Sequence, residues 1–127
     1  MANELILIVE DNPKNLKLVR DTLQVKGYGT VEATTGERGV ELAHEAHPDL
    51  ILMDIQLPGI SGIAAFRQLR DDPATRTIPV VAVAASMMPD DRNRIMAAGF
   101  DGFQGKPLSM MELLETIRHV FDRSVRE

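Results

Sequence analysis

Short apolar runs alternate with amphipathic stretches along this chain, a pattern typical of parallel strands joined by helices. Uninterrupted apolar runs of four or five residues indicate strands buried on both faces. Five strands are expected, at 5–9, 29–32 (a weak edge strand), 50–53, 79–83 and 100–104. Five helices are expected, between Asn12 and Gly27 and at 36–46, 61–70, 89–98 and 109–122. Strict alternation predicts a flavodoxin-like, doubly wound α/β fold, a five-stranded parallel sheet in the order 2-1-3-4-5.

Capping residues mark where several of these helices begin. Asn12 stands before a proline, a pairing typical of an N-cap and first helical position. Thr34 with Glu37, and Ser109 with Glu112, have the spacing of a capping box. The last four residues of the chain are expected to fray.

Length and composition are those of one ordinary globular domain. The chain has 127 residues, 44% hydrophobic and 26% charged, which predicts a single domain over 1–127 with no output domain. The net charge of -5 disfavours nucleic-acid binding, because no basic stripe is available to neutralise phosphates. Cysteine is absent, which excludes disulfides and thiolate metal sites. No basic leader and no apolar run of about 18 residues is present, so we expect a cytoplasmic protein without membrane contact.

Acidic residues and a lysine stand where three predicted strands end. Glu10 and Asp11 follow the first strand, Asp54 closes the third, and Lys106 follows the fifth. In a doubly wound sheet these ends share one edge, and ligands bind there between strands one and three. We therefore expect three carboxylates and one ammonium to converge.

Such a cluster predicts a divalent-metal and phosphoryl site. Two unit charges about 4 Å apart interact by roughly 4 kcal/mol at an effective dielectric near 20, so the carboxylates need a cation. Mg²⁺ prefers one or two carboxylates together with waters and a phosphate oxygen. Asp54 could then form an aspartyl phosphate, with Mg²⁺ and Lys106 neutralising the transferred group. A single acidic residue at a strand end is more often only a cap, but coincidence at three strand ends favours the functional interpretation.

Four sequence motifs contain or adjoin these residues: Ile8–Asn12, Pro48–Asp54, Leu57–Gly62 and Gly105–Pro107. Together they resemble the motifs of response-regulator receiver domains, and the similarity covers nearly the whole chain. The stretch from 49 to 58 is similar to the single-domain, DivK-like regulators.

The resemblance implies a role for each residue of the cluster. Asp54 would accept phosphate from a histidine kinase or phosphotransfer protein. Mg²⁺ would be held by Glu10, Asp11 and Asp54 together with the main-chain carbonyl of Gln56, and Lys106 would pair with the phosphate.

Two positions depart from the receiver pattern. Receivers place Thr or Ser where this chain has Ala84, and an aromatic switch residue, often Tyr, where it has Phe103. The missing hydroxyl puts the conformational readout in doubt rather than phosphorylation itself. Ser86, two residues further on, could partly replace it or be an ordinary loop or cap serine. Gln56 could orient or shield water at the phosphoacceptor, or be a solvated loop amide.

The leading functional prediction is a stand-alone response regulator of a two-component phosphorelay, not an enzyme acting on outside substrates. It would signal by protein–protein binding through the face formed by helix four, strand five and helix five, where methionine pairs lie at 87–88 and 110–111. The alternative is an atypical receiver that binds partners without phosphorylation, because Ala84 replaces the switch hydroxyl.

Two enzyme classes fit the sequence less well. An Mg²⁺-dependent phosphohydrolase of the haloacid-dehalogenase type places a second Asp two residues after its nucleophile, where this chain has Gln56. A dinucleotide-binding enzyme needs a glycine-rich loop after the first strand, where Glu10–Pro13 stands instead.

Overall fold

The computed structural model describes residues 3–85, 89–106 and 109–126. Five parallel strands form one sheet in the order β2-β1-β3-β4-β5, which confirms the predicted fold. The strands are β1 Leu5–Val9, β2 Gly29–Ala33, β3 Leu50–Asp54, β4 Val80–Ala84 and β5 Gly102–Gly105. The helices are α1 Pro13–Val25, α2 Gly36–Ala46, α3 Gly62–Asp71, α4 Pro89–Ala97 and α5 Met110–Arg126.

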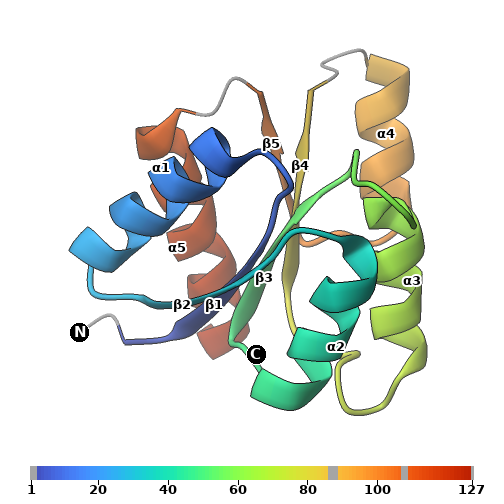
Figure 1. Ribbon diagram of the computed structural model, residues 1–127, viewed down its shortest axis with the longest axis horizontal. Coiled ribbons are helices and arrows are strands. Elements are labelled where there is room, and N and C mark those ends of the chain that lie inside the picture. Colours follow the sequence, from blue (N-terminus) through green and yellow to red (C-terminus); the bar gives the residue numbers. More distant parts are fainter. Residues whose placement is uncertain (1–2, 86–88, 107–108, 127) are drawn as a thin grey trace.

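The sheet lies between two layers of helices. Helices α1 and α5 cover one face, and α2, α3 and α4 cover the other (Figure 1). Every residue of β3 and β4 is buried, which explains why both strands are unbroken apolar runs apart from Asp54. One core cluster lies on each face, with Phe66 stacked on Phe100 at a centroid distance of 4.0 Å in the larger one. In the described part of the chain, no helix is long and apolar enough to span a membrane.

Strands β4 and β5 begin one and two residues later than expected. The residue before β4 is Pro79, which has no N–H to give to a sheet. Asp101, just before β5, accepts the N–H of Val80 at 2.8 Å and the guanidinium of Arg70 at 2.9 Å. Its own N–H donates to the carbonyl of Val80 at 2.8 Å. Asp101 therefore ties the starts of both strands together before the regular ladder begins.

The predicted capping box of α2 is wrong. The N-cap is Thr35, whose side chain accepts the N–H of Arg38 at 3.1 Å, while Thr34 is exposed. The carboxylate of Glu37 does not turn back to a cap residue. It accepts the N–H of Ile60 at 3.2 Å, from the loop between β3 and α3.

The N-caps of α1 and α5 are confirmed, but the predicted capping box of α5 is only half formed, because the Glu112 carboxylate accepts the side-chain N–H of Gln104 at 3.4 Å. Helix α5 is also longer than expected. The Asn12 side chain accepts the N–H groups of Lys14 and Asn15, and Ser109 accepts the N–H of Glu112 at 3.4 Å. Helix α5 continues to Arg126 instead of ending near 122 and fraying. In its last part, the Arg123 guanidinium donates to the carbonyl of Asp101 at 2.9 Å, which anchors the added turn to the start of β5.

Candidate metal and phosphoacceptor site

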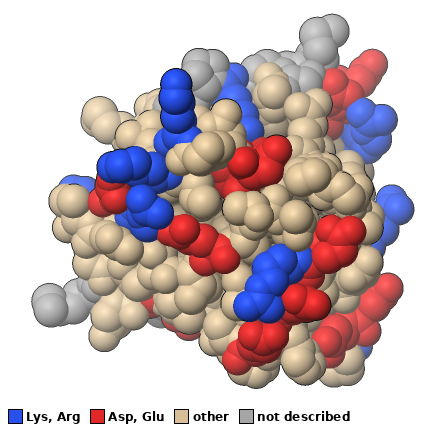
Figure 2. Space-filling model, viewed as in Figure 1, with Lys and Arg blue, Asp and Glu red and all other residues tan. Residues whose placement is uncertain are grey.

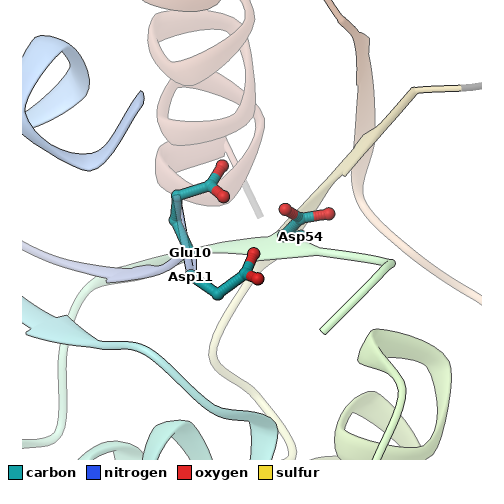
Figure 3. Close-up of side chains that lie close together, drawn as sticks. All are labelled: Glu10, Asp11 and Asp54. Carbon is teal, nitrogen blue, oxygen red and sulfur yellow. The ribbon is translucent and has the colours of Figure 1, made fainter. Parts of the chain in front are cut away.

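Three carboxylates meet at the carboxyl edge of the sheet. Glu10 and Asp11 directly follow β1, and Asp54 ends β3, its neighbour in the sheet. One oxygen of each side chain lies within 4.8 Å of one oxygen of the other two. The three carboxylates point toward a common space (Figure 3). The expected convergence at the switch point is therefore present.

Lys106 completes the cluster from the end of β5. Its Nζ lies 2.7 Å from Oδ2 of Asp54 and 3.3 Å from Oε1 of Glu10. Asp54 is 2% exposed and Glu10 is 4% exposed, whereas Asp11 is exposed to solvent. Among the described residues no cation is paired with Asp11. One ammonium thus faces three carboxylates, and negative charge is left in excess.

Main-chain donors hold the two buried carboxylates in place. The N–H of Asn12 donates to Oε2 of Glu10 at 3.0 Å, and the N–H of Gln56 donates to Oδ1 of Asp54 at 3.0 Å. Each buried carboxylate is therefore oriented by the backbone two residues further along the chain. Within the described ranges, no buried side-chain polar atom lacks a hydrogen-bond partner.

The electrostatics of the site appear in two pKa shifts. Burial raises the pKa of Glu10, and the nearby Asp54 charge adds to the increase, against the opposing effects of the Asn12 N–H and Lys106. Burial alone would lower the pKa of Lys106, but its hydrogen bond and charge interaction with Asp54, helped by Glu10, raise the pKa overall. The raised pKa keeps Lys106 a cation at neutral pH, and the raised pKa of Glu10 means that its surroundings disfavour the ionised form.

The donor set suits a hard divalent cation. Mg²⁺ binds oxygen ligands at about 2.1 Å in an octahedron, so its ligands lie at most about 4.2 Å apart. The three carboxylates, within 4.8 Å of one another, need only a small closure to share one ion. The excess negative charge and the solvent-exposed Asp11 favour an ion that keeps several waters. Gln56 is placed in the adjoining loop, and the role of its carbonyl as a metal ligand stays a prediction.

Of the two residues that depart from the receiver pattern, Ala84 is the one that contacts this site, through the main chain of Lys106. Ala84 is the last residue of β4 and is 4% exposed, and its carbonyl accepts the N–H of Lys106 at 2.9 Å. Phe103 in β5 is half-buried and packs against the hydrophobic core cluster that includes Ala84. The Arg92 guanidinium lies 5.7 Å from the centroid of its ring. Ser86 lies outside the described residues. The Gln56 side chain is exposed, which leaves both interpretations of it open.

The sequence interpretation missed the contacts that shape the loop after Asp54. Gly62 has no room for a side chain, because a Cβ there would press on the main-chain carbonyl of Asp54. Glu37 holds the tip of the same loop through Ile60. The glycines at 59 and 62 in the printed sequence were a possible signal of close backbone approach. The hydrogen bond between Glu37 and Ile60 joins residues 23 positions apart, and no local sequence pattern indicates it.

Comparison with known proteins identifies the family. The family model of the response regulator receiver domain matches residues 6–118. This chain belongs to that family. Receiver domains act in two-component signalling, and membership implies interaction with histidine kinases or phosphotransfer proteins.

Named relatives and solved structures agree with this assignment. The receiver domain is 46% identical over 113 residues to the polar-differentiation response regulator DivK of Brucella ovis, covering 89% of this chain and 92% of the relative. It is 32% identical to the receiver domain of the sensor histidine kinase PA1611 from Pseudomonas aeruginosa, with a TM-score of 0.84 and coverage of 94% and 98%. That structure has a magnesium ion coordinated in the active-site cleft. The chemotaxis response regulator CheY4 of Vibrio cholerae has a TM-score of 0.88 at 25% identity, covering 94% of this chain and 99% of CheY4.

Proposed function

We propose that this receiver domain accepts a phosphoryl group on Asp54 from a histidine kinase or a phosphotransfer protein, and signals by binding other proteins. The observation that carries the proposal is the placement of the Asp54 carboxylate. It ends a central strand, lies 2.7 Å from the Lys106 ammonium, and shares a space with two further carboxylates. The ends of three strands thus supply the site: β3 supplies the nucleophile Asp54, β5 supplies the cation Lys106, and β1 supplies two further metal ligands.

In this proposal each residue of the site has a separate role in phosphoryl transfer. An oxygen of Asp54 attacks phosphorus, and the bond from phosphorus to the donor nitrogen of phosphohistidine breaks, leaving its electron pair on the imidazole. Lys106 lies where it can contact the transferred oxygens and balance their charge. Glu10, Asp11 and Asp54 would hold Mg²⁺, with the Gln56 carbonyl as a fourth ligand. The ion supplies positive charge to the transferring group when bound.

In this proposal the chain is a phosphoacceptor and not an enzyme for outside substrates. The covalent product stays on Asp54, and its chemistry is limited to Mg²⁺-dependent self-phosphorylation and loss of the phosphoryl group to water. Asp54 is 2% exposed, which suits a group that reacts with a docked donor. Gln56 has an exposed side chain two residues further on, and we propose that it orients or shields the attacking water.

The downstream partner is proposed to bind the face formed by α4, β5 and α5. Met96 on α4 is 41% exposed, and methionine is an adaptable contact residue. Met111 on α5 is 78% exposed, but it lines a hollow together with Lys26 and Tyr28, which follow α1, so it does not support this face. The Met87–Met88 pair expected at this face lies outside the described residues. The net charge of -5 supports a protein partner over nucleic acid. Acidic and basic side chains are interspersed on the face seen in Figure 2, which shows no broad basic surface.

A second candidate function rests on Ala84. Ala84 ends β4 and accepts the N–H of Lys106 through its carbonyl, and it carries a methyl group at the position where receivers ordinarily have a hydroxyl. A ligand shifts a conformational equilibrium only through contacts that differ between the two states. Without that hydroxyl, the domain could bind its partner equally well with and without phosphate. Comparing partner capture by the phosphorylated and unmodified proteins distinguishes the two functions.

The test of the main proposal is direct labelling. The protein is incubated with acetyl phosphate and Mg²⁺, and its intact mass is measured. We expect the gain of one phosphoryl group, lost in Asp54→Asn and on chelation of Mg²⁺. Asp71→Asn, which changes an exposed carboxylate on α3, is the matched control and should label normally. Unchanged labelling of Asp54→Asn would contradict the proposal.

A further inference from the structure

The loop between β3 and α3 is tied at its tip to the start of α2. Glu37, in the first turn of α2, accepts the N–H of Ile60 at 3.2 Å through Oε2. A Cβ on Gly59 would lie 2.6 Å from each oxygen of that carboxylate, so the carboxylate lies directly against the loop backbone. A Cβ on Gly36 would lie 2.7 Å from Cγ1 of Ile60. The loop tip therefore packs on the beginning of α2.

The two ends of the same loop are hydrogen-bonded to each other next to Asp54. The N–H of Gly62 donates to the carbonyl of Ile55 at 2.9 Å, and the backbone of Gly62 lies against the main chain of Asp54. The N–H of Ile55 donates to the carbonyl of Val83 at 2.9 Å. Gln56 leaves this closed base and donates its N–H to Oδ1 of Asp54. The loop thus runs from Asp54 out to α2 and back, and Gln56 lies between its closed base and the tip that Glu37 holds.

We propose that Glu37 is a positioning residue for the site, which holds the loop so that Gln56 presents its main chain to Asp54 and to a bound Mg²⁺. This inference rests on the proposed function of Asp54. The Glu37 carboxylate stands in the first turn of α2, where the helix dipole favours negative charge. Helix α2 therefore provides a fixed acceptor for the loop. Among the described residues, Glu37 is the side chain from outside the loop that hydrogen-bonds its tip at Ile60.

Three variants separate positioning from a general effect on α2. Glu37→Ala removes the acceptor and the charge, while Glu37→Gln removes the charge and keeps a carbonyl acceptor. Glu45→Ala is the matched control, because Glu45 is exposed on the same helix and pairs with Arg38 at 3.4 Å. If Glu37 acted only through helix charge, the Ala and Gln variants would behave alike. If it positions the loop, Gln should restore what Ala loses.

The first measurement is amide hydrogen exchange in the metal-free protein. At Ile60 and Gln56 we expect exchange about tenfold faster in Glu37→Ala, and near wild type in Glu37→Gln and Glu45→Ala. Amides of β3 and β4 report whether the fold itself has changed. Equal exchange at Ile60 in the wild type and Glu37→Ala overturns the inference.

The second measurement is Mg²⁺ affinity together with the rate of labelling by acetyl phosphate. We expect Glu37→Ala to bind Mg²⁺ about two- to tenfold more weakly and to label more slowly, with both values recovered in Glu37→Gln. Unchanged values in Glu37→Ala, or equal losses in both Glu37 variants, overturn the inference. Failure of the proposed function looks different, because the wild type itself would then gain no phosphoryl group on Asp54.

Discussion

At the end of β4, the methyl group of Ala84 stands where a receiver domain ordinarily carries a hydroxyl. Ala84 is 4% exposed and packs with the core cluster that also contacts Phe103. Neither side chain offers a donor to a phosphoryl group on Asp54. At the scale of single residues, the described part of the site therefore keeps the carboxylates and the lysine of the proposed phosphoryl site, while Ala84 and Phe103 add no polar contact to it.

Ala84→Thr should supply the missing contact. A hydrogen bond to a charged group contributes about 1.5–3 kcal/mol, so a phosphate analogue such as beryllofluoride should bind roughly tenfold more tightly or better in this variant. Titration with the analogue in the presence of Mg²⁺ measures the change. Ala84→Val is the control, since it adds a similar volume without a hydroxyl. Equal tightening in both variants would mean that the gain comes from packing and not from a hydrogen bond.

Helix α3 begins directly against the main chain of Asp54. Gly62 is the first residue of α3, and a Cβ there would press on the Asp54 carbonyl and lie 2.7 Å from Cα of Ile55. These neighbours are backbone atoms and cannot rotate away. Glycine is therefore required at 62 because the main chain of Asp54 and Ile55 leaves no room for a side chain.

Gly62→Ala should lower the free energy of unfolding by about 1–3 kcal/mol, the usual cost of overpacking. It should also weaken Mg²⁺ binding, because the displaced backbone is that of Asp54, one of the proposed metal ligands. Chemical denaturation and Mg²⁺ titration measure the two effects. Gly29→Ala is the matched control, since a Cβ at Gly29 would meet Cδ1 of Leu5 at an ordinary 3.5 Å and should change stability little. A stable Gly62→Ala protein with normal Mg²⁺ affinity would show that α3 can shift without disturbing the site.

The elements and their order were predictable from the sequence, because buried parallel strands leave unbroken apolar runs such as 50–53. The convergence of Glu10 with Asp54 followed from that order and needed no other information. The choice between Thr34 and Thr35 as the α2 cap did not follow, since both carry the same chemistry and only tertiary packing separates them. The contact from Glu37 to Ile60 was also invisible, because it depends on how α2 packs against a distant loop.

For the molecule as a whole, we expect the carboxylate cluster to make the free energy of unfolding depend on the Mg²⁺ concentration and on pH. A ligand that binds only the folded state adds about 2.7 kcal/mol of stability at roughly one hundred times its dissociation constant. The raised pKa of Glu10 means that the metal-free folded protein binds this proton more tightly than the unfolded chain, whose value is near 4.5. The ionised Glu10 therefore costs stability at neutral pH, and that cost begins to fall as the pH drops through the raised pKa and is gone below the unfolded value near 4.5.

Mg²⁺ should consequently stabilise the protein most at neutral pH and less as the pH falls toward the raised pKa of Glu10, because the proton and the ion compete for the same cluster. Thermal unfolding with and without Mg²⁺ at a series of pH values measures the effect. Asp11→Asn is the control, because this exposed side chain can be changed without disturbing the core, and its Mg²⁺ increment should shrink at every pH. A Mg²⁺ increment independent of pH would exclude Glu10 from the metal cluster. An increment unchanged in Asp11→Asn would place the ion elsewhere on the molecule.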